Sequence, residues 1–359
     1  MPPIARRSVV QTRRRCAFTL IELMVVIAVI LLLIGILLPS LRKARDHAKA
    51  VSCSTNLHHV GLAMSDYLYS SKGVYPPSYV YPSDADGRWA PETQSEGREY
   101  GYMHWSYFLY DSGEVNDKAF QCPDFEHGGA PRTNPGLKRE DWEERQVDDQ
   151  GDRGASDRVD KQAPRIAYGA NAAIMPRNKF NTTLSGGSRV NVFVREPSIK
   201  HAGSTILATE YLNNWKGLGV EGPGGILSKS HRPINPFFHV GSGANEYAAA
   251  PNAPGFLYGL PNDQDFYGLL PLKDVRERAN ILDYTSGVPQ INAVGRHHPT
   301  ADKIYSKKFG GAANFLYCDS HVESMTPLES VVRRQWGTHY YSLSGQSQIL
   351  NMGSVAGQP

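Results

Sequence analysis

Residues 16–39 read CAFTLIELMVVIAVILLLIGILLP, and this stretch decides how the fold begins. Residues 23–38 are sixteen consecutive positions without a charge, and one carboxylate, Glu22, stands directly before them. Counted from Phe18 the block has 21 residues, and as a helix it spans about 32 Å at roughly 1.5 Å per residue. That length is enough to cross the hydrocarbon core of a bilayer. Because a charge within a membrane segment is costly, Glu22 is a candidate functional residue.

The segment in front of this block is strongly basic. Residues 1–17 contain no acid and five arginines, which are Arg6, Arg7, Arg13, Arg14 and Arg15. The whole chain has a net charge of +3, so removal of these five charges leaves −2 for residues 18–359. The basic excess therefore predicts an N-terminus retained in the cytoplasm. No basic patch remains to neutralise phosphates, which argues against nucleic acid as a partner.

Three interpretations of the apolar block compete. A secretory signal peptide needs a short apolar region and a small-residue cleavage site. Ala48-Lys49-Ala50 offers such a site, but the apolar run is long and three basic residues lie in between. A plain membrane anchor accounts for the length and leaves Glu22 unexplained. The third interpretation treats residues 17–22, Ala-Phe-Thr-Leu-Ile-Glu, as one functional unit.

Residues 17–22 resemble the processing site of type IV pilins and type II secretion pseudopilins. The resemblance implies that prepilin peptidase removes a basic leader, residues 1–17, by cutting between Ala17 and Phe18. It implies methylation of the new N-terminus at Phe18, and a role for Glu22 in assembly. Pro39 falls where many of these proteins bend their helix. The family usually has Gly before the cut, where this chain has Ala17, which is also small.

The apolar block is expected to continue as an amphipathic helix over residues 39–72. Apolar residues recur at steps of three and four from Val51 to Leu68, the pattern of a helix with one buried face. Pro39 lacks an N–H, so we expect it to kink this helix without ending it. Gly73 and the pair Pro76-Pro77 predict its end.

Residues 73–359 predict a β-rich extracytoplasmic domain, because short apolar runs alternate with Gly- and Pro-rich turns. Two insertions are expected, at about 138–161, which is dense in charge and should be an exposed loop, and at 217–299, with a short helix near 272–282. Strand-like segments are expected at 119–123, 190–194 and 205–209, and the aromatic run 105–110 should pack. The predicted fold class is α+β, pilin-like: a long N-terminal helix, whose first half (18–38) spans the membrane, packed on an antiparallel sheet with large loop insertions.

Residues 310–323 predict a β-hairpin that turns at Asp319-Ser320, since Asp tolerates turn conformations. The segment resembles the Gly-Asn-Phe-Leu-x-x-Asp-Gly-His-Val hairpin of large bacterial pilin-like proteins with an uncharacterised secreted domain and a His-x9-Asp-Gly motif. The matching positions are Asn314, Phe315, Asp319 and His321. Ser320 replaces the turn Gly, and Phe309 stands where the motif has His.

Signals for catalysis are poor, and no enzyme activity is expected, because the sequence has none of the usual hydrolase, P-loop or zinc-protease motifs. Weak metal candidates are a site made of His297 or His298 with Asp319 and His321, and a calcium-type loop fragment with Asp84 and Asp86. Neighbouring residues on a helix point about 100° apart, so His297 and His298 are not expected to share one ion there. No cofactor is expected, with calcium the only candidate.

Cysteine use depends on the processing interpretation. Cys16 would leave with the leader, and Cys53, Cys122 and Cys318 would remain on the oxidising side of the membrane. Three pairings are open, and we favour Cys53 with Cys122, which leaves Cys318 as a free thiol in the hairpin.

The leading hypothesis is a pilin-like or pseudopilin structural subunit of a type IV pilus-like filament or type II secretion pseudopilus. Expected partners are prepilin peptidase (which also methylates), other pilin-like subunits, the assembly machinery and the membrane. The expected location is the bacterial inner membrane, crossed once, with the N-terminus cytoplasmic. The alternative is a membrane-tethered extracytoplasmic domain, enzymatic or binding glycan or calcium, that uses only the pilin-type anchor.

Overall fold

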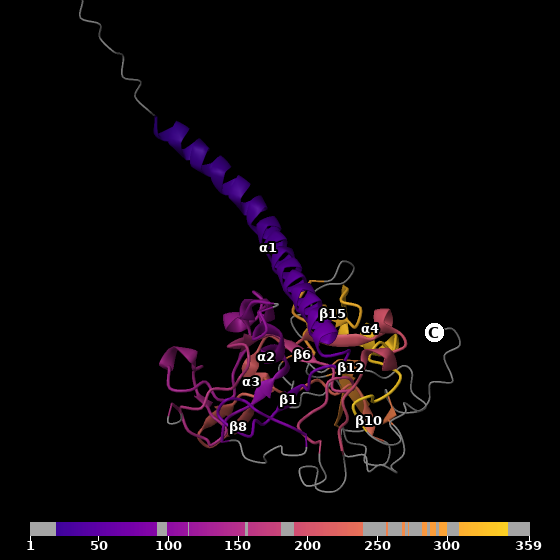
Figure 1. Ribbon diagram of the computed structural model, residues 1–359. Coiled ribbons are helices and arrows are strands. Elements are labelled where there is room, and N and C mark those ends of the chain that lie inside the picture. The colour runs from indigo at the N-terminus through magenta and orange to yellow at the C-terminus, as the bar shows by residue number, and fades with distance from the viewer. Residues whose placement is uncertain are drawn as a thin grey trace, which may run out of the picture. The chain divides into compact units, whose positions relative to one another are not determined.

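The computed structural model describes residues 19–91, 99–113, 115–154, 157–180, 190–239, 256–257, 268–269, 272, 282–285, 288–291, 294–299 and 309–343. Figure 1 shows the ribbon and labels several of its elements. The chain divides into two compact units, Met1–Arg45 and Asp46–Pro359. The fold class is α+β, as the sequence predicts, with a long N-terminal helix and a domain that contains several sheets.

Helix α1 covers Leu20–Ser70, with Pro39 inside it. Pro39 has no N–H to donate to the carbonyl of Gly35, yet the helix continues, as expected. In the first unit, the large apolar side chains between Leu20 and Leu38 are all exposed. This part of α1 is long and apolar enough to cross a membrane.

In the second unit, α1 buries one face in the core of the domain. Its fully or almost fully buried residues are spaced by three and four positions: Cys53, Leu57, Val60, Gly61, Ala63, Met64 and Leu68. Val51 was expected on this face but is 66% exposed. The buried stripe therefore begins at Cys53. The helix ends where Gly73, with φ +76°, donates to the carbonyl of Leu68.

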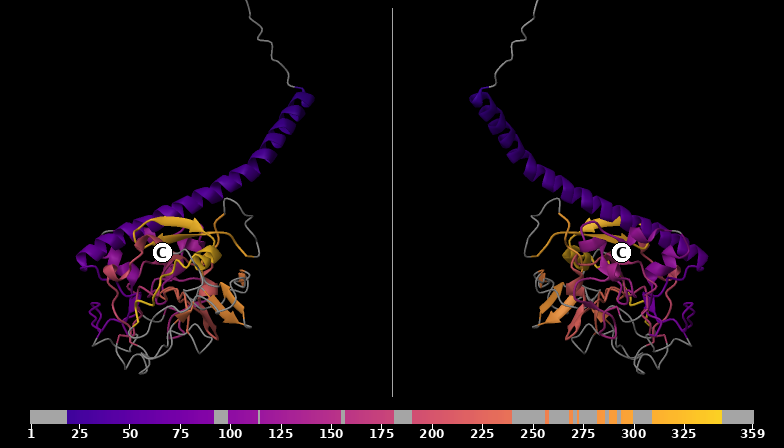
Figure 2. Two further views of the ribbon diagram at one scale, coloured as in Figure 1. Left: turned by 90° about the vertical axis from the view of Figure 1, so that its right-hand side faces the viewer. Right: turned by 90° about the vertical axis from the view of Figure 1, so that its left-hand side faces the viewer.

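The central sheet of the domain is antiparallel and packs against this buried face of α1. Its strand order is β16-β15-β7-β6. The strands are β6 (Tyr168–Ala170), β7 (Ile206–Glu210), β15 (Ala313–Tyr317) and β16 (Val322–Met325). Figure 2 shows the yellow strands β15 and β16 beside the C-terminal half of α1. The approach is close, because a Cβ on Gly61 would meet the Leu316 side chain. The predicted hairpin at 310–323 and the predicted strand at 205–209 are confirmed.

Smaller sheets complete the described part of the domain. Two-stranded sheets pair β1 (Tyr79–Val80) with β2 (Met103–His104), β3 (Ala130–Pro131) with β5 (Arg165–Ile166), and β10 (Phe238–His239) with β11 (Phe256–Leu257). Three-stranded sheets join β4 (Gln146–Val147), β9 (Gly225–Leu227) and β8 (Val220–Gly222), and β12 (Gly268–Leu269), β14 (Val288–Ile291) and β13 (Leu282–Thr285). The pairs β4–β9 and β12–β14 are parallel, so the domain is mixed rather than wholly antiparallel.

The remaining helices are short. The α-helices are α2 (Trp105–Tyr110), α3 (Trp215–Leu218) and α4 (Pro327–Val332). The 3-10 helices are η1 (Asp117–Phe120), η2 (Glu126–Gly128), η3 (Arg139–Asp141), η4 (Glu196–Ser198) and η5 (Ala202–Ser204). The aromatic run 105–110 forms α2 and buries Trp105 and Leu109, which confirms the expected packing.

Three local predictions are wrong. Residues 119–123 are not a strand, because they complete η1 and then turn at Pro123. Residues 190–194 form an isolated bridge from Asn191 to Leu343 instead of a strand. The segment 138–161 is not simply exposed, since it buries Trp142 and pairs through β4. The helix expected near 272–282 lies almost wholly outside the described residues.

Candidate functional site

The first candidate site is the start of α1. The cleavage pair Ala17 and Phe18 lies outside the described residues. Thr19 and Glu22 form a reciprocal cap: the Thr19 amide and hydroxyl donate to Glu22 Oε2 at 2.9 and 2.8 Å, and the Glu22 amide donates to Thr19 Oγ1 at 3.2 Å. This is the capping-box arrangement, in which a Glu at the third helical position satisfies the free end of the backbone. Glu22 therefore has a local role in this chain besides its charge.

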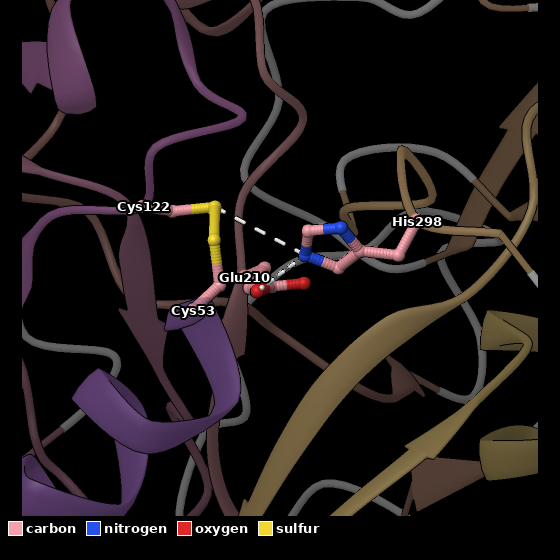
Figure 3. A group of neighbouring side chains, drawn as sticks. All are labelled: Cys53, Cys122, Glu210 and His298. Atoms are coloured by element: carbon pink, nitrogen blue, oxygen red, sulfur yellow. Dashed lines mark hydrogen bonds and ion pairs between the residues drawn. A yellow bond between two sulfur atoms is a disulfide. The ribbon is translucent and has the colours of Figure 1, made fainter. Parts of the chain in front are cut away.

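The second candidate site is a buried ionic cluster in the domain, centred on Glu210 and His298 (Figure 3). Glu210 ends strand β7, and its side chain is fully buried. One of its oxygens, Oε1, lies 2.9 Å from Nε2 of His298, which is also fully buried. The Asn314 amide donates to Glu210 Oε2 at 2.9 Å, and Asn314 Nδ2 donates to Oε1 at 2.9 Å. Both carboxylate oxygens are thus satisfied.

Charges of alternating sign lead from this cluster toward the surface. Nδ1 of His298 lies 3.3 Å from Asp124 Oδ2, and Asp124 Oδ1 lies 3.1 Å from Nζ of Lys49 on α1. Lys49 and Asp124 are partly exposed, with side-chain exposures of 33% and 17%, whereas His298 and Glu210 have none. The cluster therefore connects α1, the segment after Cys122, strand β7 and the segment before β15.

The pKa shifts follow from burial and these contacts. Burial lowers the pKa of His298, but Asp124 and Glu210 outweigh it and raise that pKa to about 9. Burial raises the pKa of Glu210, but the hydrogen bond with His298 and the neighbouring histidines hold it below its usual value. Burial likewise opposes ionisation of Asp124, whose contacts with His298 and Lys49 lower its pKa to about 2.

His297 lies next to this cluster and is less well satisfied. Its ring centroid is 4.3 Å from that of His298. Its Nε2 lies 3.6 Å from the sulfur of Cys122 and 3.9 Å from Glu210 Oε2. Burial lowers the pKa of His297 to about 4, so the ring is neutral near pH 7. From the sequence, His297 and His298 were not expected to share one ion if they lay on a helix. The structure places them outside any helix, so that argument does not apply.

The disulfide joins Cys53 of α1 to Cys122, the pairing favoured from the sequence. Both half-cystines are fully buried, and Cys122 lies beside the two histidines. Cys318 is a free, buried thiol, and burial raises its pKa to about 12. The disulfide and the ionic cluster thus fix the same stretch of α1 to the domain.

The hairpin residues separate into two places. Asn314 contacts Glu210 and also donates from Nδ2 to the Ala50 carbonyl of α1 at 3.3 Å, while Phe315 is buried in the core. Asp319 and His321 pair with each other at 2.5 Å between Oδ1 and Nδ1, and both side chains are more than 40% exposed. They share no ligand group with His297 or His298 among the described residues, so the structure does not bring these four residues together.

The calcium-type fragment is a local turn. Asp84 Oδ1 accepts from the Arg88 amide at 3.0 Å, and both Asp84 and Asp86 lie 3.8 Å from the Arg88 guanidinium. A cation bound there would have to compete with this positive charge. No metal-ligand group that includes Asp84 or Asp86 occurs in the described part of the chain.

Sequence reasoning did not identify Glu210 or Asp124. Glu210 directly follows the strand-like run Ile206–Thr209, and an acid at the end of a buried strand is a usable signal for a buried charge. Asp124 had no such signal, because only the folding of distant segments brings it to His298.

Comparison with known proteins gives a match at the N-terminus. Residues 12–38 match the prokaryotic N-terminal methylation motif. This match supports a type IV pilin-like prepilin signal, and together with the apolar helix it suggests membrane anchoring. No curated protein and no solved structure matches the chain.

Proposed function

We propose that the chain is a pilin-like structural subunit that prepilin peptidase cuts between Ala17 and Phe18 and methylates at Phe18. The observation that carries the proposal is the methylation motif at residues 12–38, which ends in an exposed apolar helix. The mature subunit is held in the bacterial inner membrane, with the domain on the extracytoplasmic side, until it joins a type IV pilus-like filament or a type II secretion pseudopilus.

Assembly is the step that Glu22 serves in this proposal. In a bundle of apolar helices, the positive N-terminus of a neighbouring subunit is attracted to Glu22 more strongly than in water. Pairing of the two charges also removes the cost of leaving either one alone in an apolar medium. The local cap from Thr19 does not compete with this role, because one oxygen of Glu22, Oε1, accepts no hydrogen bond from Thr19.

Two substitutions at one position separate the charge from the cap. Glu22→Gln removes the charge and keeps a side chain suited to a capping box, whereas Glu22→Ala removes both. We expect both variants to insert in the membrane at wild-type level and neither to co-purify with sheared filaments. Incorporation of Glu22→Gln at wild-type level would overturn charge pairing, and failure of Glu22→Ala alone would assign Glu22 to the cap.

A second candidate function is a tethered binding or enzymatic domain that uses only the pilin-type anchor. The observation that favours it is a groove of about 580 Å³ beside α1, lined by residues that include Asn56, His59 and Leu62. For such a protein, glycan or calcium binding by the full chain is unchanged by Glu22→Gln. Loss of filament incorporation without any ligand binding favours the structural subunit.

A further inference from the structure

The strongest unexplained feature of the domain is the buried side chain of His297. It is 7% exposed, and its Nδ1 has no hydrogen-bond partner. Its Nε2 makes only a weak contact, 3.6 Å from a disulfide sulfur, and lies 3.9 Å from Glu210 Oε2, beyond hydrogen-bond distance. Buried polar groups are usually satisfied, so a buried imidazole with an unpartnered nitrogen beside carboxylates indicates a missing ligand.

Three side chains converge at this point with donors that suit a metal ion. One ligand atom each from Asp124, His297 and His298 lies within 4.8 Å of the other two. Bonds of about 2.0–2.2 Å place tetrahedral ligands roughly 3.3–3.6 Å apart. The distance between His298 Nδ1 and Asp124 Oδ2 is 3.3 Å, so this pair already has the required spacing. We propose that Asp124, His297 and His298 bind a divalent transition-metal ion, with zinc as the representative ion.

The next layer of contacts supports this assignment. A metal-bound histidine usually gives its second ring N–H to a carboxylate, which fixes its orientation. Glu210 accepts at His298 Nε2 and leaves Nδ1 directed toward Asp124. Two hydrogen bonds from Asn314 in turn hold Glu210. Glu210 is therefore a positioning residue for His298, and Asn314 positions Glu210.

The disulfide decides which donors are available. Cys53, Cys122, Glu210 and His298 also lie within 4.8 Å of one another. Sulfur binds metals as the thiolate, and the disulfide between Cys53 and Cys122 removes both thiolates. The oxidised chain thus presents nitrogen and oxygen donors only, which suit zinc better than a soft ion such as Cu(I).

A metal-free alternative exists, in which protonated His298 bridges Asp124 and Glu210. The two arrangements differ at His297, since a bridge through His298 needs nothing from His297. Removal of His297 therefore weakens metal binding and leaves the metal-free bridge intact.

The test measures zinc bound by the full chain in detergent, after EDTA treatment and dialysis, by calorimetry with ZnCl₂ and by elemental analysis. We expect one tight site per chain. His297→Gln should weaken zinc binding by more than about 100-fold, beyond the roughly 10–100-fold cost of losing an outer-shell partner. Glu210→Gln should fall within that smaller range. The control is His321→Gln, which alters an exposed His–Asp pair outside the site and should bind as the wild type does.

These measurements test the metal site whether or not the chain assembles into filaments. No tight zinc binding by the folded wild type, or equal binding by wild type and His297→Gln, overturns the proposal. Zinc K-edge X-ray absorption of the wild type keeps the test valid if His297→Gln does not fold. Imidazole and oxygen scattering support the site, whereas sulfur ligation would assign the metal to reduced Cys53 and Cys122 and reject the proposal.

Discussion

His104 illustrates at the scale of one residue how burial makes the fold sensitive to pH. It precedes α2, and its Nδ1 accepts from the Ser106 amide, so the neutral ring caps the helix. Burial lowers the pKa of His104 to about 3, against about 6.5 for an unfolded histidine. Below pH 6.5 the unfolded chain binds a proton that the folded chain does not, so stability is lost as pH falls.

His104→Asn should remove part of this pH dependence. Asn also caps helices but does not titrate. Between pH 7 and pH 5 the free energy of unfolding should fall in both proteins. We expect the fall to be about 2 kcal/mol smaller in the variant than in the wild type. Urea unfolding of the full chain at both pH values measures this difference, with exposed His339→Asn as the control. Equal losses in wild type and His104→Asn would show that His104 is protonated in the folded chain.

Single residues also show what sequence can and cannot reveal. Asn314 was identified by resemblance alone, and its partners, Glu210 and the Ala50 carbonyl, lie 104 and 264 positions away in the chain. Such contacts leave no local pattern. The turn at Asp319-Ser320 was predicted because Asp tolerates turn conformations, and it is Ser320 that adopts the left-handed conformation, with φ +73°, which favours Gly.

At the scale of elements, the β15–β16 turn packs directly on α1. Ser320 Oγ donates to the Gly61 carbonyl at 2.9 Å and lies 2.8 Å from Ser65 Oγ. A Cβ on Gly61 would lie 2.6 Å from Leu316 Cδ1 and 3.3 Å from Ser320 Cα. An alanine at position 61 would therefore force the Leu316 side chain and the hairpin turn to shift.

Gly61→Ala should destabilise the domain although it favours the helix. Alanine contributes about 1 kcal/mol of helix propensity, but overpacking at a buried contact costs roughly 1–3 kcal/mol. We expect a net loss of about 1 kcal/mol in the free energy of unfolding. Chemical unfolding measures it, and exposed Thr55→Ala on the same helix is the control. A gain in stability for Gly61→Ala would mean that the hairpin can shift to accommodate the added methyl group without a loss of free energy.

The disulfide between α1 and Cys122 should be a major source of stability. It closes a loop with a sequence separation of 69. The double variant Cys53→Ala/Cys122→Ala should lose about 4 kcal/mol on the chain-entropy argument. Thermal unfolding of oxidised and variant chains tests this loss. Non-reducing peptide mapping that links Cys122 to Cys318 would contradict the pairing itself.

Elements with local signals were predictable, and those defined by distant contacts were not. The stripe in α1 repeats at the period of a helix, and β7 is a short run of strand-forming residues bounded by turns, so both followed from sequence. Residues 138–161 look like a solvated loop because of their charge. The structure nevertheless buries Asp160, which accepts from the amides of Tyr102 and Asn134.

At the scale of the whole molecule, the two units follow different physical rules. In the first unit, the described residues 23–38 are uniformly uncharged, and their exposed Leu, Ile and Val side chains need a lipid or helical environment. In Asp46–Pro359, one large core and buried polar contacts join segments far apart in sequence. The first unit is therefore readable from sequence, whereas the cluster at Glu210 needed the structure.

The processing of the whole chain is tested at its first residue. The five arginines all lie in the leader, and the apolar block that enters the membrane has none. Cleavage should therefore change the N-terminus and leave membrane insertion intact. Mass spectrometry of the membrane-extracted protein should find a methylated Phe18 terminus. Ala17→Gly should be processed at least as completely, whereas Ala17→Leu, which enlarges the residue before the cut, should retain the leader at an unchanged membrane level. An intact Met1 terminus in the wild type, or one at Val51 as a signal peptide would give, rules out the prepilin pathway for this chain.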